Sequence, residues 1–179
     1  MERRKIRSKW VLAVEHFQIV RQLSRQVFKI PKNVEELIQI SASFEQMLKN
    51  RTLRCLFSQF LEREYSEENL IFWLACEEVN QIKDSAVVAK KINEIYESFI
   101  TKNAPLELNL SSDVRLQIIA SIGNPDPSIF RTAQDQIFLL MKNDSYPRFL
   151  KSDLYLKLMK SFDESGQISS RRTMSEADV

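Results

Sequence analysis

Glycine is almost absent from this chain. Only Gly123 and Gly166 occur among its 179 residues. Dinucleotide-binding and P-loop folds need several glycines in one short motif, because only glycine lets the backbone approach a phosphate closely. Both fold types are therefore excluded. The remaining sequence shows long stretches in which apolar residues recur with the 3.6-residue period of a helix. We therefore predict an all-α protein.

The apolar periodicity and the capping residues place the expected helices along the chain. Polar residues precede several periodic stretches and are predicted to cap the helices that follow. The predicted caps are Asn33, Ser66, either Asp84 or Ser85, either Ser111 or Ser112, and Ser128. One stretch is expected to break near Ser41, and the proline at 147 should interrupt the helix before it. The expected helices cover residues 6–29, 33–49, 51–64, 67–82, 86–101, 111–122 and 128–143, with short helices to about 159.

Charge divides the chain unevenly, although the net charge is only +2. Residues 1–32 hold nine basic and two acidic residues, a net charge of +7, and the remainder has a net charge of −5. We therefore expect three parts: a basic amphipathic helical extension at 1–32, a domain at 33–160 and a disordered polar tail at 161–179.

The basic extension has two interpretations. It suits an amphipathic helix on an anionic membrane, or an extra helix or helical pair that packs on the domain. Nucleic-acid binding is disfavoured, because the body is acidic and carries no recognition motif. The residues expected to contact a membrane are Arg3, Arg4, Lys5, Arg7, Lys9 and Trp10.

The sequence offers little for catalysis or metal binding. His16 is the single histidine, and the two cysteines, Cys55 and Cys76, lie in apolar helical stretches typical of buried thiols. No nucleophile–base pair or carboxylate dyad is evident, and no apolar run approaches the length of a membrane span. We expect no catalytic residue, metal, cofactor or small-molecule substrate.

Three polar patches are not required by packing. Asn69 lies near the start of a helix, where it could be an idle surface residue or a side chain held for a partner. Asn109 lies in a loop between two leucines, where it could simply form a turn or could be a rigidly held hydrogen-bonding side chain at the tip of the loop. Asp144 and Arg148 are four residues apart and could pair, or Asp144 or Ser145 could cap the next helix. Such patches suit binding better than chemistry.

Three motifs now define a resemblance. Residues 64–78, EYSEENLIFWLACEE, are followed by Leu108-Asn109-Leu110 and then by residues 144–150, DSYPRFL. In this order they resemble the regulator of G-protein signalling (RGS) family, over about residues 43–159. The resemblance implies an all-helical domain of about nine helices that includes a four-helix bundle.

The resemblance also implies a function. Family members bind the switch regions of GTP-loaded Gα subunits and accelerate GTP hydrolysis, while the hydrolysis itself belongs to Gα. Asn69, Leu140, Asp144 and Ser145 would help to form the pocket for a switch threonine. Asn109 would reach toward the glutamine of Gα that orients water, and Arg148 would brace Asp144. The full set of implied Gα-facing residues is Glu64, Tyr65, Glu68, Asn69, Asn109, Leu140, Asp144, Ser145 and Arg148.

Two positions depart from the family pattern. Ser111 replaces a common acid and Val114 a common threonine, so the support of the Asn109 tip could differ. We expect a cytoplasmic GTPase activator for Gα of the i/o or q class, peripheral to the inner face of the plasma membrane if residues 1–32 bind lipid. The alternative is a non-catalytic scaffold or docking module of a larger protein.

Overall fold

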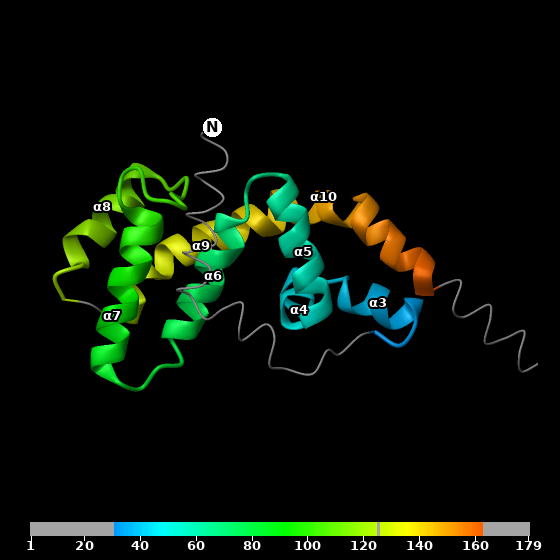
Figure 1. The fold of residues 1–179 in the computed structure, drawn as a ribbon, viewed down its shortest axis with the longest axis horizontal. Helices are drawn as coiled ribbons and strands as arrows, with labels where there is room; N and C mark the ends of the chain where they lie inside the picture. The colour runs from blue at the N-terminus through cyan, green and yellow to red at the C-terminus, as the bar shows by residue number, and fades with distance from the viewer. Residues whose placement is uncertain (1–30, 125, 163–179) are drawn as a thin grey trace, which may run out of the picture. The chain divides into compact units, whose positions relative to one another are not determined.

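The computed structural model describes residues 31–124 and 126–162. All regular structure in these two ranges is helical, which confirms the all-α prediction. The chain divides into two compact units (Figure 1). The described part of the first unit comprises residues 66–124 and 126–141, and that of the second comprises residues 31–65 and 142–162.

The second unit begins with three short helices. They are α3 (Val34–Ile40), α4 (Phe44–Lys49) and α5 (Arg51–Arg63). Asn33 caps α3 as predicted, because its Oδ1 accepts the backbone N–H of Glu36 at 2.9 Å. The expected break near Ser41 is also confirmed, since α3 and α4 are separate helices and Ser43 caps α4.

An aromatic cluster forms the core of the second unit. The ring of Phe57 lies 5.7 Å from that of Phe44 and 5.3 Å from that of Phe149, in edge-to-face geometry. Tyr146 joins the cluster, and its hydroxyl donates to the backbone oxygen of Ser41 at 2.6 Å. Burial raises the pKa of Tyr146 to about 12. α5 thereby packs against α4 and against α10 (Tyr146–Leu150).

The prediction that the proline at 147 interrupts the helix is wrong. A π-helix, η3 (Met141–Ser145), leads directly into α10, and Tyr146 is its first residue. Pro147 is the second residue of α10, and the fixed φ of proline suits the first turn of a helix. A further helical stretch covers residues 153–162 and so includes the first two residues of the expected tail. The rest of that tail lies outside the described residues.

The first unit contains most of the longer helices. They are α6 (Glu68–Val79), α7 (Ser85–Ile95), α8 (Ser112–Ser121) and α9 (Arg131–Leu140), with a π-helix η1 (Tyr96–Ile100) and a 3₁₀ helix η2 (Pro127–Phe130). Of the two predicted caps of α7, Asp84 is the one that accepts the backbone N–H groups of the first turn. The prediction that Ser128 is a cap is wrong: Ser128 lies inside η2, and its N–H donates at 2.9 Å to the side chain of Asp126, which is the N-cap residue.

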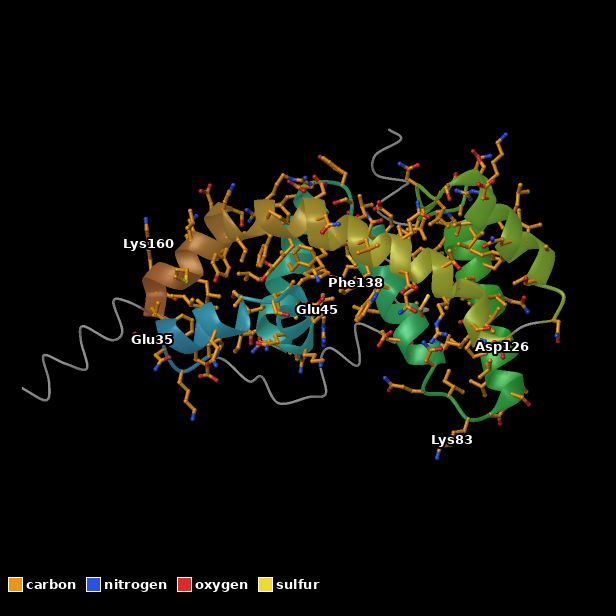
Figure 2. All side chains as sticks on the ribbon, turned by 180° about the vertical axis from the view of Figure 1, so that it is seen from behind. Glu35, Glu45, Lys83, Asp126, Phe138 and Lys160 are labelled. Carbon is orange, nitrogen blue, oxygen red and sulfur yellow. The ribbon has the colours of Figure 1, made fainter. Side chains whose placement is uncertain are left out.

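The core of the first unit centres on α6. α6 packs against α7 and α9, and its Phe72 ring lies 5.5 Å from Phe99 and 6.0 Å from Phe130. Phe138, labelled on α9 in Figure 2, contacts the indole of Trp73 at 6.2 Å between ring centroids. Lys83 lies in the loop between α6 and α7 and extends away from the ribbon in the same view. These contacts fix the helix ends from which the candidate site residues project.

The two cysteines differ in burial. Cys76 is buried, as predicted, and burial raises the pKa of its thiol, whereas Cys55 is partly exposed. Among residues 31–124 and 126–162, every helix is too short or too polar to cross a lipid bilayer.

Candidate functional site

The nine site residues expected from the resemblance fall in both units. Glu68 and Asn69 begin α6, Asn109 lies in the loop between η1 and α8, and Leu140 ends α9. In the second unit the site residues stand at two places: Glu64 and Tyr65 follow α5, while the others lie in η3 or α10, namely Asp144, Ser145 and Arg148.

In the second unit, Arg148 connects two of the expected residues. Its Nη2 donates to Glu64 Oε2 at 2.7 Å and its Nε to Glu64 Oε1 at 3.2 Å, a bidentate pair. Its Nη1 donates to Asp144 Oδ1, so the expected Asp144–Arg148 pairing is present. The two carboxylates raise the pKa of Arg148, with Glu64 the larger cause. The cluster keeps an exposed carboxylate on Asp144 in a fixed orientation.

Tyr65 stands beside this cluster in an unusual conformation. Its φ of 55° lies in the left-handed region, which is uncommon for residues other than glycine. The side chain is 83% exposed. The turn is held by the backbone N–H of Tyr65, which donates to Glu62 O at 3.2 Å. Large exposed tyrosines are frequent hot spots of protein interfaces, and local strain of this kind clusters at functional sites.

Asn69 differs from its expected environment. α6 begins at Glu68, and its N-cap residue is Glu67. The prediction that Ser66 caps this helix is therefore wrong. Tyr65 turns the chain just before this point, and Glu67 already has helical φ and ψ. Asn69 is 7% exposed rather than freely presented. Its amide donates to Ser66 O at 3.0 Å and to Glu68 Oε1 at 3.2 Å, which fixes its orientation.

Glu68 is a half-buried carboxylate next to this amide. Burial raises its pKa from 4.5 to about 7, and the neighbouring Glu67 adds to the shift. A carboxyl that titrates near neutrality can accept or donate a hydrogen bond, depending on pH. This property could not be read from the sequence, in which Glu67 and Glu68 look alike.

The loop that carries Asn109 has the predicted design. Leu108 is 1% exposed and Leu110 is 8% exposed, whereas Asn109 between them is exposed. The backbone N–H of Leu108 donates to Phe99 O at 3.0 Å and ties the loop to η1. The two buried leucines therefore anchor the loop and leave the Asn109 side chain outside.

The remaining expected residues differ in exposure. Leu140 is 42% exposed at the end of α9, and Ser145 is 4% exposed in η3. Ser111 is the N-cap residue of α8 but makes no side-chain capping bond.

The six residues proposed for membrane contact lie outside the described residues. Within the described ranges, no group of three or more His, Cys, Asp or Glu side chains is arranged to hold a metal ion.

Two side-chain partners have no clear signal in the sequence. Glu64 was expected to face Gα, but its pairing with Arg148 joins residues 84 positions apart and has no local signal. Arg115 was not considered, yet it contacts the loop that carries Asn109. Its position six residues after Asn109, at the start of a helix, is the only hint in the sequence.

These observations define an all-helical domain that presents braced polar side chains from loops and helix ends, a design suited to binding another protein. The profile of the regulator of G protein signaling domain matches residues 43–158. The chain therefore belongs to the RGS domain family.

Three relatives illustrate the similarity. The chain is 42% identical over 132 residues to "Regulator of G-protein signaling rgs-2" from Caenorhabditis elegans, a match that covers 74% of this chain and 78% of the relative. It is 43% identical over 129 residues to "Regulator of G-protein signaling 19" from Rattus norvegicus, covering 72% and 60%. It is 40% identical over 133 residues to "Regulator of G-protein signaling 10" from Homo sapiens, covering 74% and 73%. The chain thus spans three fifths of the rat relative's length.

Proposed function

We propose that this chain is a GTPase activator for heterotrimeric Gα subunits of the i/o or q class. It would bind the switch regions of GTP-loaded Gα, favour their transition-state conformation and so end the signal. The observation that carries this proposal is the family match over residues 43–158, which contains all nine expected contact residues.

The chemistry of the site supports this assignment. Gα already holds a catalytic arginine in cis and a glutamine that positions water. An activator therefore needs no nucleophile or base. It accelerates hydrolysis only through contacts that are stronger in the transition state than in the ground state. Oriented hydrogen-bonding groups such as Asn69 and Asn109 suit this task, and the chain itself would be no enzyme.

Individual residues receive roles in this proposal. Asn109 would reach toward the water-positioning glutamine of Gα, and Arg148 would hold Asp144 in place. Leu140, Ser145 and Asn69 would each contact the switch regions. The exposed leucine and the exposed Asn109 tip are accessible to a partner without rearrangement.

The test is single-turnover GTP hydrolysis by purified Gα subunits of several classes, with and without the chain. We expect faster hydrolysis by at least one i/o or q subunit. No acceleration of any class would contradict the proposal. Tight binding without acceleration would favour the second candidate, a scaffold that uses the same fold for docking within a larger protein. The greater length of the rat relative is the observation that keeps this candidate open.

We also propose that the basic segment at 1–32 brings the domain to the cytoplasmic face of the plasma membrane. Its +7 charge and Trp10 suit an anionic lipid surface. Vesicles that contain phosphatidylserine should bind the whole chain and lose most binding when residues 1–30 are deleted. Equal binding by both proteins would contradict this recruitment.

A further inference from the structure

Arg115, in α8, binds three groups of the segment that precedes this helix, one at the end of η1 and two in the loop. Its Nη2 donates to the backbone oxygen of Leu108 at 2.8 Å, and its Nη1 donates to the backbone oxygen of Ile100. The same Nη2 lies 3.3 Å from Glu107 Oε1. The side chain is 23% exposed, so these bonds are partly shielded from water.

Arg115 binds backbone groups that precede Asn109 in the chain and hold the loop in place. Leu108 directly precedes Asn109, and its peptide groups are held on both sides: its N–H donates to Phe99 O, and its C=O accepts from Arg115. Ile100 is the last residue of η1, where helix carbonyls lack intrahelical partners. One guanidinium therefore joins the end of η1 to the residue before the exposed Asn109.

Glu107 extends this support to the far side of the loop. Its Oε2 accepts the backbone N–H of Asn103 at 2.8 Å, while its Oε1 faces Arg115. Asn103 has a φ of 62°, a left-handed conformation that needs local support. The carboxylate thus connects the turn at Asn103 to the arginine at the start of α8.

The geometry requires an arginine. A guanidinium presents several donors in a planar fork and can reach two carbonyl oxygens and a carboxylate together. A lysine ammonium carries all its donors on one atom of a flexible stem, so it could not replace the contacts of both Nη1 and Nη2 and would leave the loop less constrained.

We propose that Arg115, supported by Glu107, is a positioning residue for Asn109 in GTPase activation. It acts through the loop backbone and does not itself contact Gα. This inference rests on the proposed GTPase-activating function. It predicts that the loss of Arg115 matters only as long as Asn109 is present.

The experiment compares single-turnover GTP hydrolysis at saturating concentrations of the parent, Asn109→Ala, Arg115→Lys and the double variant, with Gα of the class that the parent activates best. We expect Arg115→Lys to lower the maximal acceleration at least about fivefold, since small misplacement of a positioned group is costly. The double variant should be no slower than Asn109→Ala alone. Glu107→Gln should show a smaller loss in the same direction. Arg131→Ala, an exposed arginine of the same unit, is the matched control and should equal the parent.

Thermal unfolding of each variant separates positioning from general destabilisation. Asn109→Ala, Arg115→Lys and the double variant are compared at temperatures at which all remain folded. Full activity of Arg115→Lys, or a further loss when it is added to Asn109→Ala, would overturn the positioning role while the proposed function stands. A parent chain that accelerates no Gα would overturn both, so the two failures are distinguishable.

Discussion

At the scale of single residues, Glu68 has the most unusual chemistry. Its folded pKa of about 7 exceeds the ordinary value of 4.5, so the folded state favours the neutral carboxyl. Above pH 7 the desolvated charge destabilises the fold. This destabilisation is lost as the pH falls from 7 toward 4.5, because the carboxyl of the folded protein becomes protonated. Below pH 4.5 the carboxyl is protonated in the folded and in the unfolded protein.

Glu68→Gln should therefore stabilise the protein at pH 8 by about 1–2 kcal/mol, a value reduced for solvent screening. Glutamine keeps an oxygen for the amide of Asn69 but never ionises. Urea unfolding of parent and variant at pH 8 and pH 4.5 measures this difference, which should vanish at the lower pH. An equal difference at both pH values would show that the carboxyl does not titrate as described.

Single residues also show where sequence reasoning ends. The Asp144–Arg148 pair was predictable, because a spacing of four on a helix brings side chains together. The Glu64–Arg148 pair was not, because only tertiary packing joins residues so far apart in the chain. Asn69 was expected to be exposed, but tertiary burial and its own amide bonds decide otherwise.

At the scale of elements, the proline in α10 gives a clear prediction. Pro147 occupies the first turn of α10, where its fixed φ suits the helix, so Pro147→Ala should change the free energy of unfolding by less than about 1 kcal/mol. Leu139→Pro, inside α9, is the control and should cost about 3 kcal/mol or more. Chemical denaturation measures both. A large loss for Pro147→Ala would mean that the proline itself shapes the transition from η3 to α10.

The start of α4 gives a second prediction at this scale. Lys142 donates to Glu45 at 2.7 Å and, with a bond from Ser43, lowers the pKa of Glu45 to about 2. The pair's contribution to stability is present above pH 4.5 and is lost as the pH falls toward 2. Lys142→Ala should raise the pKa of Glu45 in a carboxyl NMR titration, whereas Lys49→Ala should not. An unchanged pKa in Lys142→Ala would contradict this pairing.

Most elements could be predicted because periodicity and caps are local signals. Asn33 and the break near Ser41 were identified from sequence alone, and Asp84 was one of two candidate caps. The wrong predictions fall where the local signal was ambiguous. Asp126, not Ser128, is the cap residue of η2. A proline is common both in the first turn of a helix and just after a helix end, so the sequence alone did not place Pro147 inside a helix. The π-helical turns η1 and η3 have no sequence signature.

At the scale of the whole molecule, each unit depends on its own aromatic core. Phe57 is fully buried and contacts four aromatic rings of the second unit, at Phe44, Phe60, Tyr146 and Phe149. Phe57→Ala should lower the free energy of unfolding by about 3–5 kcal/mol. Tyr65→Ala, which removes an exposed ring, should change it by less than about 1 kcal/mol. Urea denaturation measures both, and a small effect of Phe57→Ala would contradict the assigned core.

The central claim is that the domain recognises the transition-state conformation of Gα. The most direct test measures the affinity of the chain for one Gα subunit in two states: with GDP and aluminium fluoride, which mimics the transition state, and with a non-hydrolysable GTP analogue. We predict at least about tenfold tighter binding to the transition-state mimic. Equal affinity for the two states would contradict the account.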